Sequence, residues 1–392
     1  MTGTGSGLMS NYGRYPIAFS RGRGCRLWDD QDRPYLDFLS GFGVNALGHA
    51  PPRVVAAVQE QAERLIHVSN LYRIPQQEML ARRLAAGCFA DRMFFCNSGA
   101  EANEAAIKLV RKCMKDRGQP GRFEIITAAE GFHGRTLATL TASALDKVQR
   151  GYDPLPPGFR YAAFDDLPGV ERKISSYTAG IMVEAIQGEA GVRVPSPGYL
   201  EGLREIADRH GLLLVVDEIQ TGAGRTGRMW CHQWSSITPD IMTASKGLAS
   251  GLPMGVCMAT EQVAGTFSPG SHGSTSGGNP LVCAAALATL DELEGEHGVI
   301  SQVSGKGEYL MERLRGLQHH HRMVKDVRGR GLMVAIELNA PAEDAAAIAL
   351  SRGLLVNCVQ GTTLRLLPPL VVTREEIDEA TTILGGVLMD LF

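Results

Sequence analysis

Several features typical of other protein classes are missing from this sequence. The formal net charge is −3 over 392 residues, so no excess of either sign points to nucleic acid or to a charged membrane surface as a partner. No stretch reaches the roughly 20 apolar residues of a membrane-spanning helix. The opening residues, MTGTGSGLMS, lack the basic region and apolar core of a signal peptide, and we expect them to form a frayed terminus.

Paired cysteines and metal-binding spacings are missing as well. None of the eight cysteines stands in a C-x-x-C pair, and most lie in or beside apolar runs, which favours buried free thiols over disulfides or a zinc site. His319, His320 and His321 are consecutive, so their side chains face apart, and a solvated turn is a better interpretation than a metal site. We therefore expect no metal, and a location in the reducing cytoplasm.

Internal repeats and long low-complexity linkers are also missing, and the composition that remains is that of a globular protein. Hydrophobic residues make up 44% and charged residues 21% of the chain, close to the average for soluble domains. A chain of 392 residues is long enough for two or three domains with several packed layers.

Short apolar strands alternate with helices through the middle of the chain. Amphipathic helices are predicted at residues 54–66, 102–113 and 197–211, where apolar residues recur at helical spacing. The accompanying apolar runs predict strands at residues 92–99, 124–131, 179–186, 212–219, 240–247 and 254–260. This alternation indicates an α/β fold with a mostly parallel sheet that helices cover on both faces.

The two ends of the chain have a different pattern. Residues 24–38 predict two short strands around a polar turn, and residues 280–298 predict a long helix. A strand pair, two further strands and a final helix follow, an α+β pattern that predicts a second, smaller domain. We expect a large domain at residues 51–280 and a small domain formed by residues 1–50 together with 281–392.

Two residues with complementary chemistry follow apolar runs in the middle of the chain. Asp217 ends the run LLLVVD, and Lys246 follows DIMTAS. On neighbouring strand ends, such a pair suits pyridoxal 5′-phosphate (PLP), which needs a carboxylate at its ring nitrogen and an amine on its aldehyde. Taken singly, Asp217 is better explained as a capping or turn residue, and Lys246 has the alternative of an exposed lysine. The small neighbours Ser245 and Gly247 favour a lysine with space for a cofactor.

A third motif could hold the phosphate of that cofactor. NSGAEAN follows a predicted strand, which places Ser98, Gly99 and Ala100 at a helix N-terminus, where free N–H groups and the helix dipole bind phosphate. The same residues predict a capping box, with Ser98 as N-cap and Glu101 three positions later, and the two interpretations are compatible. In FHGRT, Phe132 could stack on the pyridine ring, although phenylalanine is more often part of a core.

Together these motifs resemble the class III aminotransferases, which are fold-type I PLP enzymes, and within them the acetylornithine aminotransferases. The resemblance covers nearly the whole chain. It lies in the strings YLDFLSGFGVNALGH, FFCNSGAEANEAAIKL, GFHGRTLATL, VEAIQGEAGV, LVVDEIQTGAGRTG, HGSTSGGNP and LRLLPPLVV. It implies a mostly parallel seven-stranded sheet sandwiched by helices, a smaller α+β domain, PLP as the cofactor, and a homodimer with shared active sites.

The resemblance also implies a role for each matching residue. Lys246 would hold the cofactor covalently and move the proton during transamination, and Asp217 would pair with the ring nitrogen. Arg135 would bind the α-carboxylate of either substrate, because a guanidinium grips a carboxylate bidentately. The remaining cofactor contacts would come from Ser98, Gly99, Ala100, Phe132, Ile219, Gln220 and, toward the phosphate of the neighbouring subunit, Thr275.

A second arginine predicts a switch between two substrates. Arg365 would bind the second carboxylate of 2-oxoglutarate, and Glu189 would cover Arg365 while the amino donor is bound. A static salt bridge between two loops is the alternative. Three positions depart from the family pattern, namely Ser276, Arg73 and Ala185. The departures at Ser276 and Arg73 concern packing around the amino donor.

These features predict a PLP-dependent aminotransferase that moves the δ-amino group of N-acetylornithine to 2-oxoglutarate in arginine biosynthesis. Another ω-aminotransferase of the class, with ornithine, succinylornithine, 4-aminobutyrate or lysine as donor, is the nearest alternative. A PLP aminomutase would need no external oxo acid, which the pair of Glu189 and Arg365 argues against. A non-enzymatic relative would be expected to lack Lys246, Asp217 or the phosphate loop, and all three are present.

Overall fold

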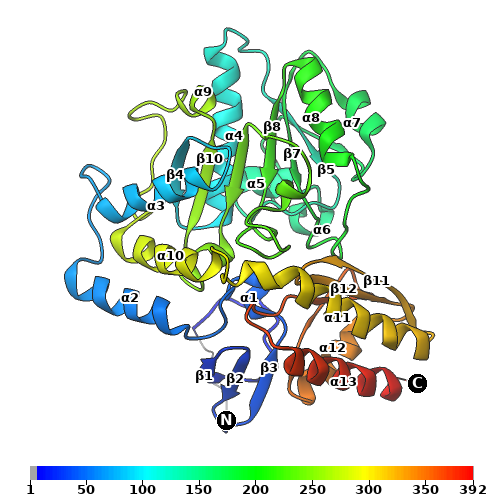
Figure 1. Ribbon diagram of the computed structural model, residues 1–392. Coiled ribbons are helices and arrows are strands. Elements are labelled where there is room, and N and C mark those ends of the chain that lie inside the picture. The colour runs from blue at the N-terminus through cyan, green and yellow to red at the C-terminus, as the bar shows by residue number, and fades with distance from the viewer. Residues whose placement is uncertain (1–6, 392) are drawn as a thin grey trace.

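A seven-stranded sheet forms the centre of the larger part of the molecule (Figure 1). The computed structural model describes residues 7–391, so most of the predicted frayed terminus lies outside the described residues. In spatial order the strands are β4 (Arg92–Cys96), β10 (Gly255–Ala259), β9 (Ile241–Ala244), β8 (Leu213–Asp217), β7 (Thr178–Glu184), β5 (Glu124–Ala128) and β6 (Phe159–Ala162). Neighbouring strands run parallel except at β10, which is antiparallel to both β4 and β9. The predicted mostly parallel sheet is confirmed.

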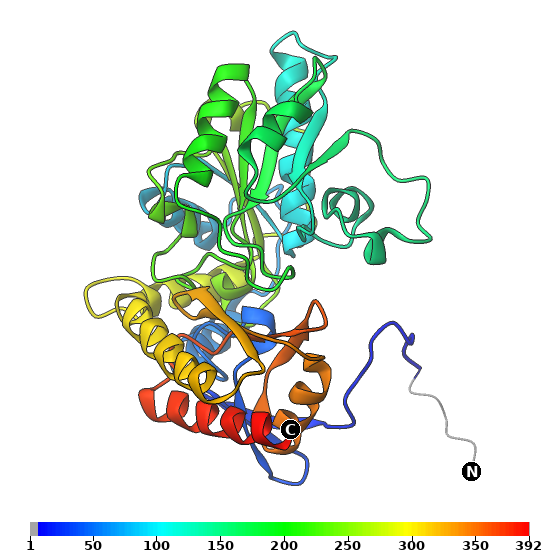
Figure 2. The same ribbon diagram turned by 90° about the vertical axis from the view of Figure 1, so that its right-hand side faces the viewer.

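Helices cover both faces of this sheet, because successive strand residues point to opposite sides. Val215 packs with α4 (Gly99–Asp116) on one face, whereas its neighbour Val216 packs with α8 (Tyr199–His210) on the other. Figure 2 shows α4 in cyan and α8 in green on opposite sides of the sheet. The helices that accompany them are α5 (Leu137–Ala142) and α9 (Glu261–Ala264) beside α4, and α7 (Leu167–Lys173) beside α8.

Local signals place most helix ends. Gly211 ends α8 at a φ of +60°, a left-handed conformation that glycine adopts at little cost, as its position predicts. The helix predicted to reach residue 66 is shorter, because α2 (Pro52–Arg64) ends where Leu65 turns to extended backbone. Leu65 and Ile66 are therefore 47% and 55% exposed instead of packing inward.

Two smaller sheets and the long helices packed against them form a second part of the molecule. The first sheet joins β1 (Phe19–Arg23), β2 (Arg26–Asp29), β3 (Pro34–Asp37) and β13 (Leu354–Leu355), and the second joins β11 (Val324–Arg330), β12 (Met333–Leu338), β15 (Thr363–Leu366) and β14 (Asn357–Val359). Since β13 pairs in parallel with β3, segments from the two ends of the chain lie side by side. They share one apolar core with the long helices. The division into domains at residues 50 and 280 stays a prediction.

The helix α11 (Ile300–His320) has no counterpart in the sequence prediction, although Val303, Leu310 and Leu314 bury a common face. His319 and His320 are exposed, as predicted for a solvated turn, but they belong to the last turn of this helix and not to a turn between elements. The helices not yet named are α1 (Ser40–Gly43), α3 (Pro75–Ala86), α6 (Asp146–Gln149), α10 (Pro280–Leu293), α12 (Ala342–Ser351) and α13 (Arg374–Asp390). Between residues 7 and 391, no helix is both long and apolar enough to cross a membrane.

Candidate active site

The carboxyl ends of the parallel strands meet at a cavity of about 370 Å³. Parallel strands end at the same edge of a sheet, so residues far apart in sequence converge there. The cavity is lined by most of the predicted site residues, namely Ser98, Gly99, Ala100, Phe132, Arg135, Glu189, Asp217, Ile219, Gln220 and Lys246. These residues therefore lie around one cavity, and their roles stay predictions.

Lys246 lies two residues beyond β9, at the start of a short 3₁₀ helix, with a φ of +47°. Left-handed backbone is uncommon for a residue with a side chain and often marks a functional position. Burial, reinforced by the charge of Arg365, lowers the pKa of Lys246 to about 8, although the charges of Glu189 and Asp217 act in the opposite direction. A lysine with this pKa has a substantial neutral fraction near neutral pH, as a nucleophile requires.

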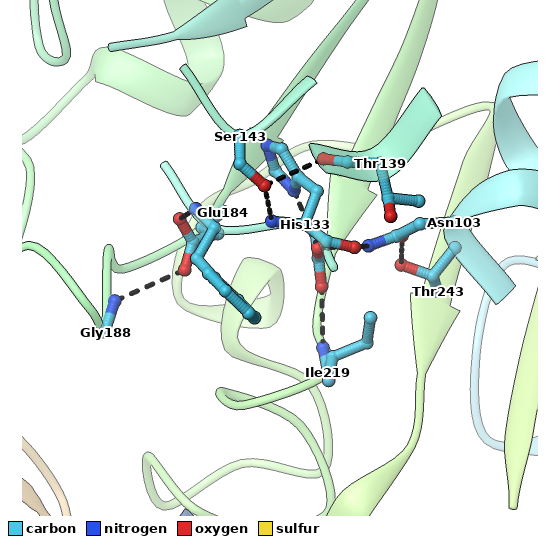
Figure 3. A network of polar contacts seen from close by, with 10 residues as sticks. Asn103, His133, Thr139, Ser143, Glu184, Gly188, Ile219 and Thr243 are labelled. Atoms are coloured by element: carbon cyan, nitrogen blue, oxygen red, sulfur yellow. Dashed lines mark hydrogen bonds and ion pairs between the residues drawn. The ribbon is translucent and has the colours of Figure 1, made fainter. Parts of the chain in front are cut away.

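Asp217 is the last residue of β8 and is only 3% exposed. Its Oδ2 accepts hydrogen bonds from Asn103 Nδ2 at 2.7 Å and His133 Nδ1 at 2.8 Å, and its Oδ1 accepts from the Ile219 backbone N–H at 3.0 Å. Figure 3 shows these three donors converging from different elements. The bond to Ile219 is the turn contact that the alternative interpretation predicts, but the two side-chain donors hold the carboxylate beside the cavity.

The N-terminus of α4 borders the same cavity. Ser98 Oγ accepts the Glu101 backbone N–H at 3.2 Å, which confirms Ser98 as the N-cap. The Glu101 carboxylate accepts the Asn97 N–H at 2.5 Å instead of the Ser98 N–H that a capping box predicts, so this half of the prediction is wrong. First-turn N–H groups have no partner within their own helix, which leaves those of Gly99 and Ala100 for an anion.

Gly99 is required at this position for a steric reason. A Cβ atom on Gly99 would lie 2.8 Å from Ile219 Cδ1, closer than carbon atoms approach in proteins. The glycine thus lets the helix N-terminus sit directly against the residue that follows β8.

Arg365 and Glu189 form an ion pair beside the cavity. Arg365 Nη1 donates to Glu189 Oε1 at 2.7 Å and to Gln220 Oε1 at 3.2 Å. Burial would raise the pKa of Glu189, but the charge and hydrogen bond of Arg365 outweigh it and lower that pKa. The Arg365 side chain is fully buried and that of Glu189 is 32% exposed. This geometry agrees with the covered state of the predicted switch, while the switch itself stays a prediction.

Other predicted residues lie around or away from the cavity. The Arg135 guanidinium stands 5.5 Å from the Phe132 ring centroid at the cavity wall. Thr275 and Ser276 do not line this cavity but a separate surface hollow beside Asn97, so a contact of Thr275 with a neighbouring subunit stays a prediction. Arg73 is exposed and pairs with its neighbour Glu78, and Ala185 is buried in the core.

Three buried polar residues of the site were not predicted. Asn103 donates to Asp217 and accepts a hydrogen bond from Thr243 Oγ1 at 2.7 Å. His133 lies on the loop after β5, and Glu184 is the last residue of β7. An asparagine on the apolar face of a helix is the one signal that could have revealed Asn103. Glu184 stands in the apolar run of residues 179–186, which could have marked it as a buried carboxylate, whereas nothing in the local sequence marks His133 as buried.

Comparison with known proteins identifies the family. The model of the class-III aminotransferases matches residues 9–388. The chain belongs to this family. Acetylornithine aminotransferases from Caldanaerobacter subterraneus subsp. tengcongensis and Aquifex aeolicus are 46% and 45% identical to it, over 98% and 97% of this chain and 98% and 99% of their own lengths.

Solved structures of the class III aminotransferase fold superpose closely. An ornithine aminotransferase from Toxoplasma gondii gives a TM-score of 0.94 at 34% identity and covers 98% of this chain and 93% of its own. An N-acetylornithine aminotransferase from Stenotrophomonas maltophilia gives 0.85 at 35% identity, with 96% and 97% covered. The predicted fold type is confirmed, and the chain is a PLP-dependent aminotransferase.

The residues of the cavity fit PLP on chemical grounds. Lys246 offers a buried amine with a lowered pKa, Asp217 a buried carboxylate, and α4 an uncovered helix N-terminus for a phosphate. When bound, PLP supplies an electron sink for the carbanion that forms at the substrate carbon. The protein must hold the ring, orient the substrate and move protons, and the cavity has a candidate residue for each task.

Proposed function

We propose that this aminotransferase moves the δ-amino group of N-acetylornithine to 2-oxoglutarate, as a step of arginine biosynthesis. The relatives that match over nearly their full length at 44–46% identity are named acetylornithine aminotransferases. The observation that carries the proposal is the buried Arg365 covered by Glu189 at the cavity. An enzyme that binds two different substrates in turn at one site needs a contact that can break for one substrate and form again for the other.

The charges of the two substrates explain the arrangement. Both carry an α-carboxylate, and Arg135 at the cavity wall is the residue proposed to bind it. Only 2-oxoglutarate brings a further carboxylate. Arg365 binds that group after Glu189 withdraws, and Glu189 neutralises Arg365 while the donor is present, since an unpaired buried guanidinium would be costly.

Lys246 and Asp217 act in both half-reactions. Asp217 favours a protonated ring nitrogen by charge pairing. Lys246, released as a neutral amine, takes the proton from the substrate carbon and returns it as an acid, a task suited to a group whose pKa is about 8. The same two residues therefore act on both substrates, whereas Glu189 and Arg365 discriminate between them.

We further propose a cytoplasmic homodimer in which Thr275 reaches the phosphate site of the partner. Leu71 and Tyr72 are 88% and 68% exposed, and such apolar surface is typical of an interface. Asn70, next to them, donates to the backbone oxygens of Ser274 and Gly277, so this surface and the Thr275 loop are joined. The eight free cysteines support a reducing compartment. Light scattering should give twice the 42.1 kDa chain mass.

A spectral titration tests the proposed reaction. Purified enzyme should absorb near ~420 nm with its bound cofactor, N-acetylornithine should bleach that band, and 2-oxoglutarate should restore it. Lys246→Ala should bind substrates without turnover. Bleaching by 4-aminobutyrate or lysine but not by N-acetylornithine would refute the proposal.

Ornithine is the second candidate donor, because an ornithine aminotransferase superposes with a TM-score of 0.94. The two donors differ only in the acetyl group on the α-amine, which removes a positive charge. A ratio of kcat/KM that favours ornithine by tenfold or more would replace the first proposal with this one.

A further inference from the structure

Glu184 is a second buried carboxylate at the site and has no role in the proposed reaction so far. It ends β7, lines the cavity and is 7% exposed. Its Oε2 accepts the Phe132 backbone N–H at 2.9 Å, and its Oε1 accepts the Gly188 N–H at 3.3 Å (Figure 3). The two N–H groups come from different loops, so the carboxylate is held in a fixed place.

His133 lies between this carboxylate and Asp217. Its Nδ1 bonds to Asp217 and therefore carries a proton, since an ionised carboxylate only accepts hydrogen bonds. Its Nε2 is buried and has no hydrogen-bond partner among residues 7–391. Nε2 of His133 and Oε2 of Glu184 each lie 3.4 Å from the point where a side chain on Gly131 would begin. The free imidazole nitrogen and the carboxylate thus border the same gap, which exists because residue 131 is a glycine.

The charges of this group are coupled. Burial alone would lower the pKa of His133, but the hydrogen bond and charge of Asp217, with the charge of Glu184, raise it above its ordinary value. Burial raises the pKa of Glu184 to about 7; the charge of Asp217 adds to this effect and that of His133 opposes it. Lys246 is the other charged group that interacts with Glu184. Both groups therefore bind a proton more readily than an ordinary histidine or glutamate side chain does.

We propose that Glu184 is a positioning residue for the ring-nitrogen site, which shares one proton with His133 and so maintains the negative charge of the Asp217 cluster. With that proton on either residue, Asp217, His133 and Glu184 together carry one negative charge. If His133 were protonated without Glu184, the charges of His133 and Asp217 would cancel, and the cluster would no longer favour a protonated ring nitrogen. The role extends the proposed function, because it acts on the cofactor through Asp217.

The protonation state of His133 tests this role in the protein without PLP. Nitrogen-15 NMR of histidine-labelled protein distinguishes a protonated from a bare ring nitrogen. In the wild-type protein, the pKa of His133 should lie above the ordinary value for histidine. Glu184→Gln removes the carboxylate charge and should lower the pKa of His133 by at least ~0.5 units.

Two further variants separate charge from structure. Glu184→Asp keeps the charge but shortens the side chain, so it should weaken the bonds to Phe132 and Gly188 while leaving the pKa of His133 above its value in Glu184→Gln. Thr243→Val removes a hydrogen bond from the opposite side of the cluster without changing any charge, and it should leave the titration of His133 as in wild type.

Equal His133 titrations in wild type and Glu184→Gln would overturn the proposal. So would a His133 pKa at or below the ordinary value for histidine in the wild-type protein, a result that needs no variant to fold. Either outcome would leave the aminotransferase reaction standing, because the measurement uses neither PLP nor substrate. Conversely, a failed spectral titration with N-acetylornithine would leave the His133 result unaffected.

Discussion

Two ion pairs at the cavity differ in how firmly they are held. His133 and Asp217 are joined at 2.8 Å with side chains 0% and 3% exposed, and Asp217 has further donors in Asn103 and Ile219. Arg365 and Glu189 are joined at 2.7 Å, but the Glu189 side chain is 32% exposed. Glu189 also lies on a loop beyond β7, whereas Asp217 is part of a central strand.

The difference matches what each pair would have to do. A cofactor that stays in place needs a charge that does not move, and a fully bonded buried carboxylate provides it. Two substrates that bind in turn need a charged group, here Arg365, that its partner Glu189 can cover and uncover. Such a movement requires that the partner have access to water. The predictions below test this division between a fixed pair and an exchangeable one.

The largest effect is expected for Asp217→Asn. Removing the charge opposite the ring nitrogen should slow both half-reactions by about 10²–10³-fold, since it removes a charge that acts in every transition state. Stopped-flow absorbance on each half-reaction measures this. An effect on only one half-reaction would contradict the idea that Asp217 serves both substrates.

Asp240→Asn is the matched control. Asp240 precedes β9 at the opposite end of the sheet, where its carboxylate accepts from Arg204 at 2.7 Å and from the Leu214 N–H at 2.8 Å. The variant should lower the free energy of unfolding and leave both half-reactions within about threefold of wild type, since distant sites act independently.

Arg365→Ala should produce a selective loss. The KM for 2-oxoglutarate should rise about 100-fold, in line with the loss of one partner of a buried charged contact, and the donor half-reaction should change much less. Glu189→Gln, which removes the charge that neutralises Arg365 but leaves Arg365 in place, should spare 2-oxoglutarate and weaken the donor. Steady-state kinetics with each substrate varied decides, and equal losses for both substrates in Arg365→Ala would favour a static salt bridge.

The pH dependence of PLP uptake should report on Lys246, which both pairs influence. Because the pKa of Lys246 is lowered to about 8, its neutral, reactive form increases as pH rises toward 8 and is nearly complete above pH 9. The rate of PLP capture by the apoenzyme should therefore rise with a midpoint near pH 8 and level off above about pH 9. Arg365→Ala should move the midpoint upward, since the positive charge of Arg365 helps to lower this pKa.

The smallest effect is expected for Ser98→Ala at the N-cap of α4. Loss of the hydrogen bond to the Glu101 N–H should reduce the free energy of unfolding by about 1 kcal/mol in urea titrations without PLP. Thr373→Ala removes the comparable N-cap of α13, which lies away from the cavity. Only the Ser98 variant should also weaken PLP binding, and equal PLP affinities in the two variants would exclude Ser98 from the phosphate site.

Much of the site could be predicted because its chemistry lies in short strings. Asp217 and Lys246 follow strand-forming runs, and parallel strands end at one edge, so their proximity follows from the order of elements. Glycine at position 99 and a serine N-cap before it likewise mark a helix start in the sequence itself. The fold class follows from the alternation of predicted strands and helices along the chain. The resemblance to a family then added a predicted role for each site residue.

Tertiary contacts decided the rest. The approach of His133 to Glu184 and the gap beside Gly131 depend on segments that meet only after β5 and β7 pair, and no local pattern encodes such a meeting. The exposure of Leu65 and Ile66, predicted to face a core, has another reason, because α2 ends at Arg64 and the two residues no longer belong to its helical face. The amino-acid order thus determined the elements and the reactive groups at their ends, whereas charge, solvent access and proton affinity arose from distances between segments that only the folded chain brings together.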